Sequence, residues 1–168
     1  MAIDISAVGA SIVITPHSGT PITITEFSDE GTPFDAGDVD VSTNAKNLNG
    51  QMISSRTPAV YPVSVTVIPG SDNDFELQQL LQKSSIMPGG IAPVDNIIID
   101  SIVLSVPAIN QSGRGFTRKY EWSAGRIKTG PTGPSTSSEG RQSARTYTFE
   151  MEQFTALQGE GQNVSSLV

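Results

Sequence analysis

The stretch YPVSVTVIPGSDND, residues 61–74, decides how the fold is interpreted. Valine at positions 63, 65 and 67 alternates with Ser64 and Thr66, which predicts a strand with one apolar and one polar face. The dipeptide Pro69-Gly70 is typical of a turn and ends this strand. The stretch therefore predicts a strand that leads through a tight turn into a helix.

A helix is predicted over about residues 72–84. Asp72 or Asn73 can cap its first turn, and Glu76 follows Asn73 at the spacing of a capping box. Lys83 suits the negative, carboxyl-terminal end of the helix dipole. One apolar stripe contains three of the seven leucines of the chain, which are Leu77, Leu80 and Leu81. We expect this to be the one helix of the chain.

The composition predicts a mainly β protein of one domain, residues 1–168. The chain contains 29 Val and Ile but only 7 Leu, together with 36 Ser and Thr. Residues branched at Cβ pack well on a pleated sheet, whereas helical cores usually contain Leu and Ala. The 16 Gly and 11 Pro add turn signals, so we expect many short strands.

The other strands are predicted from β-branched and alternating segments. Residues 10–27 are expected to form a hairpin, and residues 96–106 a central strand that is covered on both faces. Asp38-Val39-Asp40-Val41 alternates and predicts a strand with an acidic face, and the Asn-Gly pair predicts a loop over residues 44–50. Further strands are expected at residues 51–57, 116–127 and 146–154, and a flexible tail at residues 156–168.

Several classes of protein are excluded because the residues they need are missing. The chain has no Cys, which rules out disulfides, thiolate catalysis and Cys-ligated metals, and its single His17 rules out a site with two imidazoles. We expect no enzyme activity, no cofactor and no metal, since no nucleophile–base arrangement is visible. The group Asp35, Asp38 and Asp40 lacks the register of a calcium loop. A secretory signal and a membrane span are also not expected.

Charge is distributed unevenly along the chain. The net charge of −7 argues against a protein whose main task is to grip nucleic acid. Residues 1–100 hold 12 acidic and 3 basic residues, whereas residues 101–168 hold 5 acidic and 7 basic residues. An acidic half and a mildly basic half suit head-to-tail self-assembly, because a heterologous contact joins two different surfaces. In the alternative, the two halves interleave in the fold and the asymmetry disappears.

The order of these features resembles the tail tube proteins of contractile-tailed bacteriophages. The resemblance covers about residues 8–155, from a hairpin and an acidic excursion through one helix to further strands. Besides residues 65–74, it is carried by YEWSAGRI at 120–127, EGR at 139–141 and TYTFE at 146–150. The tube proteins of type VI secretion systems and phage-like bacteriocins share this fold, so the resemblance does not separate them.

The resemblance implies a structural virion protein rather than an enzyme. Its fold would be an antiparallel β-sandwich or barrel with one flanking α-helix, and its copies would form hexameric rings. These rings would stack head to tail into a tube, through which double-stranded DNA passes without tight binding. The implied partners are the tail sheath, tape measure, baseplate hub and tail terminator proteins. The protein would be assembled in the host cytoplasm and function in the phage tail. A monomeric β-sandwich binding module is the alternative.

Two groups of residues are candidates for the surfaces of such a tube. A wall that repels DNA phosphates needs carboxylates and hydroxyls, because Lys and Arg would hold the DNA. Our lumen candidates are Asp38, Asp40, Glu150 and Glu152, of which the first two are preferred. Residues 28–56 hold little apolar material, so we expect this excursion to order against a neighbouring subunit. The candidates for contacts between subunits or rings are Asn44, Lys46, Asn47, Asn49, Arg114, Arg118 and Lys119.

Overall fold

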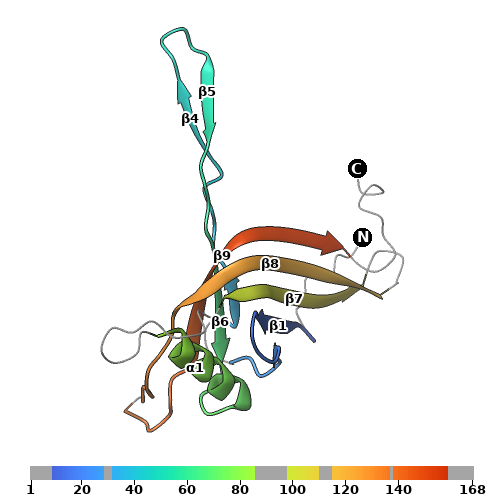
Figure 1. The fold of residues 1–168 in the computed structure, drawn as a ribbon, viewed down its shortest axis with the longest axis vertical. Helices are drawn as coiled ribbons and strands as arrows, with labels where there is room; N and C mark the ends of the chain where they lie inside the picture. The colour runs from blue at the N-terminus through green and yellow to red at the C-terminus, as the bar shows by residue number, and fades with distance from the viewer. Residues whose placement is uncertain (1–8, 29–31, 86–97, 110–114, 137, 159–168) are drawn as a thin grey trace.

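The structure is a computed structural model that describes residues 9–28, 32–85, 98–109, 115–136 and 138–158. Its body is one antiparallel sheet of seven strands in the order β2-β1-β7-β8-β9-β6-β3 (Figure 1). A separate two-stranded sheet projects from this body. One helix, α1, packs against the body at the end far from this projection. The strands are β1 (Ser11–Pro16), β2 (Ile22–Ile24), β3 (Phe34–Ala36), β4 (Ser42–Lys46), β5 (Met52–Arg56), β6 (Tyr61–Val67), β7 (Ile99–Ile109), β8 (Gly115–Thr129) and β9 (Arg145–Gln158). The prediction of a mainly β fold with one flanking helix is confirmed.

β6 forms where the valine alternation predicts it and pairs with β9. One face of this pair is hydroxyl-rich: the Ser64 and Thr148 side-chain oxygens lie 3.2 Å apart, and those of Thr66 and Thr146 lie 3.0 Å apart. The other face is fully buried and contributes Val63, Val65, Val67, Tyr147, Phe149 and Met151 to the core. Burial of these side chains removes apolar surface from water and is the main stabilising term of the sheet.

The helix α1 (Asp72–Ser84) has the predicted bounds but a different cap. Ser71 is the N-cap, and its hydroxyl accepts a hydrogen bond from the Asp74 amide at 3.2 Å. The capping box predicted at Asn73 is therefore wrong. Asn73 instead donates from its side chain to the Thr23 carbonyl at 2.8 Å, which ties the helix to the edge strand β2. No helix in the described part of the chain is long and apolar enough to cross a membrane.

The sheet curls, so that its edge strand β3 returns toward its middle. The rings of Phe34 on β3 and Trp122 on β8 have centroids 5.5 Å apart, although β6 and β9 separate the two strands in the sheet order. Phe34 therefore closes over the concave side of the sheet. This curl places residues that are far apart in the sequence around one apolar groove.

The curl coincides with an irregular point in β8. The buried residues of β8 include Trp122 at an even position and Ile127 at an odd position, so the buried parity changes between them. Ala124 lies in this interval with a φ of 55°, which is uncommon for a residue with a side chain. At Gly125, a Cβ atom would collide with the Glu150 carbonyl oxygen of β9. Glycine thus permits the close approach of the two strands.

One predicted burial pattern, one strand boundary and one charge pattern are corrected by the structure. β7 is central, but Val103 between the buried residues Ile102 and Leu104 is only half-buried, so cover on both faces is wrong. β9 continues to Gln158, so residues 156–158 belong to a strand, and the rest of the predicted tail lies outside the described residues. The acidic and basic halves interleave, because β6 lies between β9 and β3.

Candidate functional site

The strands β4 and β5 form an arm, defined here as residues 42–56, that stands away from the body along the long axis of the molecule (Figure 1). The strands pair from Ser42 opposite Arg56 to Lys46 opposite Met52. Every residue of both strands is exposed. A hairpin of two strands without a packed face is at best marginally stable in water. The arm therefore has little to stabilise it within its own chain.

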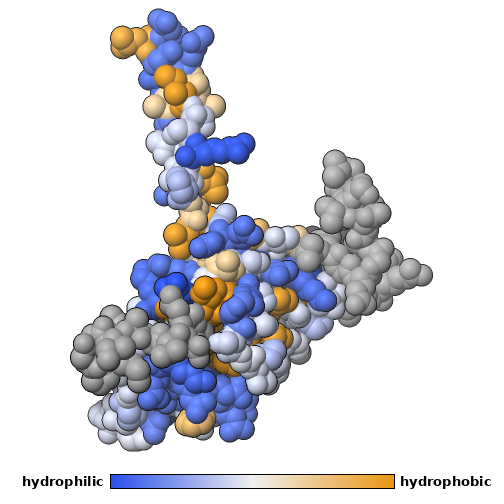
Figure 2. Space-filling model, in the orientation of Figure 1, coloured by the Kyte–Doolittle hydropathy of each residue, from blue (hydrophilic) through white to orange (hydrophobic). Residues whose placement is uncertain are grey.

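The two faces of the arm differ in chemistry. Residues that pair across the hairpin share a face, so Lys46, Met52 and Arg56 lie on one face and Ile53 lies on the other. Neither cation has an ion-pair partner among the described residues. Met52 is 70% exposed, Ile53 is 57% exposed, and Leu48 in the tip is fully exposed. Figure 2 shows apolar and hydrophilic surface side by side on the arm.

The tip of the arm is a turn that is held together by its own hydrogen bonds. The Asn47 side-chain oxygen accepts hydrogen bonds from the amides of Asn49 at 3.0 Å and Gln51 at 2.9 Å. Gly50 adopts a φ of 76°, which favours glycine. Of the predicted contact residues, Asn47 thus holds the turn together. Asn44 and Lys46 lie on β4, so the loop predicted over residues 44–50 begins three residues later.

The preferred lumen candidates, Asp38 and Asp40, lie exposed in the connection between β3 and β4. The strand predicted at residues 38–41 is wrong. The strand instead covers Ser42–Lys46, because these are the residues that pair with β5 on either side of the hairpin turn. The assignment of the two carboxylates to a lumen stays a prediction, and it no longer has the support of an alternating strand.

The second pair of lumen candidates lies on β9 in a mixed environment. The Glu150 carboxylate forms an ion pair with Lys128 of β8 at 2.6 Å. On the neighbouring strand β6, Glu150 pairs with Pro62, which is two positions from Ser64. Ser64 contacts Thr148 through its hydroxyl, so the polar face of β6 and the polar face of β9 lie on the same side of the sheet. Glu152 is exposed two positions further along β9. This face carries hydroxyls and both signs of charge.

The basic contact candidates do not form one patch. Arg118 and Lys119 are consecutive residues of β8 and therefore point to opposite faces of the sheet. Lys119 is exposed, whereas Arg118 is half-buried. Arg114 lies outside the described residues.

An apolar groove beside the base of the arm was not predicted from the sequence. It has a volume of about 390 Å³. Trp122 is at its centre, and ring centroids of Tyr120 and Phe154 lie 6.5 Å and 5.4 Å from that of Trp122. The remaining lining residues are Phe34, Ala36, Gly37, Val39, Tyr61 and Leu104. The groove is lined from five strands and from the connection after β3, so only the curl of the sheet reveals that these residues meet.

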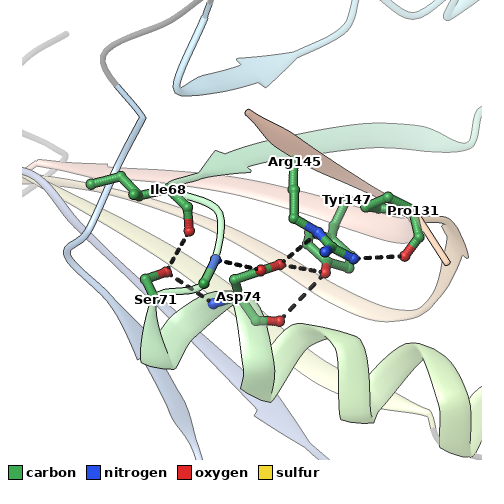
Figure 3. A network of polar contacts seen from close by, with 7 residues as sticks. Ile68, Ser71, Asp74, Pro131, Arg145 and Tyr147 are labelled. Carbon is green, nitrogen blue, oxygen red and sulfur yellow. Dashed lines mark hydrogen bonds and ion pairs between the residues drawn. The ribbon is translucent and has the colours of Figure 1, made fainter. Parts of the chain in front are cut away.

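A buried polar network joins the helix to β9 (Figure 3). One oxygen of Asp74 accepts a hydrogen bond from the Tyr147 hydroxyl at 2.8 Å, and the other accepts from the Gly70 amide at 3.0 Å. The Arg145 Nε atom lies 3.0 Å from the same carboxylate, in an ion pair whose geometry is not that of a hydrogen bond. Arg145 also donates to the Pro131 carbonyl. Burial, followed by the contact with Asp74, raises the pKa of the Tyr147 hydroxyl well above its usual range.

This network has the character of a structural joint rather than a catalytic site. The side chains of Asp74, Arg145 and Tyr147 are buried and turned toward one another inside the body. His17, in the turn after β1, lies 3.1 Å from Asp100 on β7 and is exposed. The described residues contain no cluster of three side chains that could hold a metal ion.

The curled sheet with one helix is a fold found in contractile injection systems. A chain in the cryo-EM structure of the PVC sheath/tube terminator of an extracellular contractile injection system, in the extended state, superposes with a TM-score of 0.59. The two chains are 12% identical, and the match covers 94% of this chain and 99% of the other. A chain in the structure of the anti-feeding prophage baseplate gives a TM-score of 0.56 at 9% identity, covering 94% and 97%.

A family model identifies the relatives of the chain by sequence. The model for the tail fiber protein gp32 matches residues 3–155, and the chain belongs to this family. No curated protein sequence matches the chain. Family and fold together describe a tail-related structural protein.

Proposed function

We propose that the chain is a self-assembling subunit of a contractile phage tail, whose copies form stacked hexameric rings of the tail tube type. The observation that carries this proposal is the arm. Ten strand residues are held away from the body with every side chain exposed, and three of the exposed side chains in the arm are large and apolar. Such a surface is stable only when a partner covers it.

The fold and the family favour a copy of the same chain as that partner. The fold is shared with chains of a sheath/tube terminator and a baseplate, and the family is named for a tail protein. In the proposed tail the rings enclose a channel for double-stranded DNA and contact the sheath, tape measure, baseplate hub and terminator. A single ring that ends a tube, as the name of the terminator suggests, is the second candidate.

The test removes the arm without disturbing the body. Thr43 and Ser55 face each other in the β4–β5 register, so residues 44–54 can be replaced by Asn-Gly, a dipeptide suited to a two-residue hairpin turn. We expect wild-type protein to form rings or tubes by negative-stain microscopy and sedimentation, and the shortened variant to stay monomeric. Circular dichroism and the melting temperature show that the variant is folded.

The outcomes separate the candidates. Tubes many rings long support the tube subunit, whereas isolated rings support the terminator-like role. Solid fibres without a channel, wild-type protein that stays monomeric at high concentration, or tubes formed by the shortened variant would each contradict the proposal.

A further inference from the structure

The turn between β6 and α1 exposes apolar and acidic side chains at one end of the body. We define the corner as Glu26, Ile68, Asp72, Phe75 and Glu76. Ile68 is 45% exposed and Phe75 is 61% exposed, although both are large apolar residues. The Ile68 amide donates to the Glu26 carbonyl, which places Glu26 at this corner as well.

The corner carries three carboxylates, whereas one cation, Arg141, lines the hollow beside Ile68, so acidic side chains outnumber basic ones here. Glu26 and Asp72 are exposed, and Glu76 is partly exposed one turn further along the helix. None of the three carboxylates has an ion-pair partner among the described residues. The arm, in contrast, carries Lys46 and Arg56 and no carboxylate. The two surfaces therefore match in both apolar character and charge, and complementary charge favours the correct register of an interface.

The arm and the corner lie at opposite ends of the molecule. In Figure 1 the long axis is vertical, with β4 and β5 at the upper end and α1 at the lower end. A shift of one copy along this axis brings its arm toward the helix end of the next copy. A contact between two different surfaces that repeats in one direction does not close on itself and builds a stack.

We infer that the arm of one subunit docks on the corner of a second copy of this chain, with Leu48 and Met52 against Ile68 and Phe75. Lys46 and Arg56 then face the carboxylates of the corner. This inference rests on the proposed function and adds the receiving surface to it. The apolar groove around Trp122 is the competing receptor on the same chain.

The absence of cysteine makes a direct test possible, because introduced thiols have no background. A Leu48→Cys/Phe75→Cys chain carries one thiol on each proposed surface. Under assembly conditions, a short bismaleimide cross-linker is expected to give a ladder of dimers, trimers and higher species on a denaturing gel. Either single variant is expected to stop at dimers. The matched Leu48→Cys/Phe154→Cys chain tests the groove.

Charge reversal provides the second arm of the test. Lys46→Glu/Arg56→Glu should lower the assembled fraction about tenfold, since exposed ion pairs are replaced by repulsion. Adding Asp72→Lys and Glu76→Lys to the same chain should restore assembly. Lys83→Glu, at the other end of α1, is the matched control and should have no effect.

Failure of the inference can be distinguished from failure of the proposed function. Normal tubes that give a ladder only with the Leu48→Cys/Phe154→Cys chain, or with neither double variant, overturn the corner as the receptor. Tubes whose charge-reversed variants are not rescued by the second reversal do the same. Wild-type protein that never assembles overturns both.

Discussion

Asp74 is the point at which three parts of the chain meet. Its carboxylate contacts the Tyr147 hydroxyl of β9, the Arg145 guanidinium at the start of the same strand, and the Gly70 amide of the turn before the helix. Its backbone amide is held by the cap residue Ser71. Because the Asp74 carboxylate is buried, the energetic cost of removing its charge from water must be offset by these partners.

Replacing Asp74 with Ala leaves the Arg145 cation buried without its counter-charge. We expect the free energy of unfolding to fall by about 3–5 kcal/mol, which is the usual cost of breaking a buried pair from one side. Urea denaturation monitored by circular dichroism measures this. Asp72→Asn, two residues away and exposed, is the control and should change the stability by less than about 1 kcal/mol.

Tyr147 makes the stability of the fold decrease with rising pH in the alkaline range. Because its pKa is raised in the folded protein, the native state keeps a proton that the unfolded chain loses above about pH 10. Stability from this group is complete below that pH and falls above it, by up to about 1.4 kcal/mol per pH unit. Tyr147→Phe should remove this dependence in denaturation series between pH 9 and pH 11 (roughly the range that brackets the free phenol). An unchanged slope would contradict the assignment.

Elements with strong local signals were predicted well, and the others were not. The valines of β6 and the leucines of α1 mark these two elements by their spacing alone, and the structure has them at Tyr61–Val67 and Asp72–Ser84. Asp38 and Asp40 alternate with valine just as clearly, yet they form no strand. In the arm the position of the strands is set by their distance from the turn, which local alternation does not report.

The irregular point of β8 is the element-level feature that sequence reasoning missed. Gly125→Ala should lower the free energy of unfolding by about 3 kcal/mol, because the new Cβ collides with the β9 backbone at Glu150. Gly133→Ala is the matched control, since a Cβ there meets nothing within 4 Å. Thermal unfolding of the two variants compares them. Equal melting temperatures would show that β8 and β9 can separate at no cost.

The candidate surfaces of the whole molecule depend on long-range pairing. The excursion of residues 28–56 was expected to become ordered against a neighbouring subunit, because it holds little apolar material. In the structure, part of this excursion forms the exposed hairpin of the arm. The groove around Trp122 and the corner at Phe75 could not be predicted, because their residues meet only through the curl of the sheet and the turn into α1. The acidic and basic halves of the sequence did not predict two separate charged surfaces, because strands from both halves interleave in the sheet.

The proposed lumen assignment can be tested in assembled particles. If Asp38 and Asp40 line the channel, changing both to Lys should leave tube assembly intact and slow DNA release, because cations bind phosphates. The comparison is Glu150→Lys/Glu152→Lys, which tests the face of β9. Fluorescent measurement of DNA release after triggered contraction identifies the pair that faces the channel. Normal release from both variants would contradict the lumen assignment for all four residues.

In the proposed assembly, the exposed arm also has a consequence for when growth starts. A lone subunit must fix a marginal hairpin against its partner at the first docking step, and this entropic cost has few contacts to offset it. Each later subunit meets a row of arms that is already ordered. Growth of this kind shows a lag, and preformed fragments remove it by acting as seeds. Polymers are therefore expected to begin where another part of the tail first presents an ordered platform, and spontaneous growth elsewhere is expected to be suppressed.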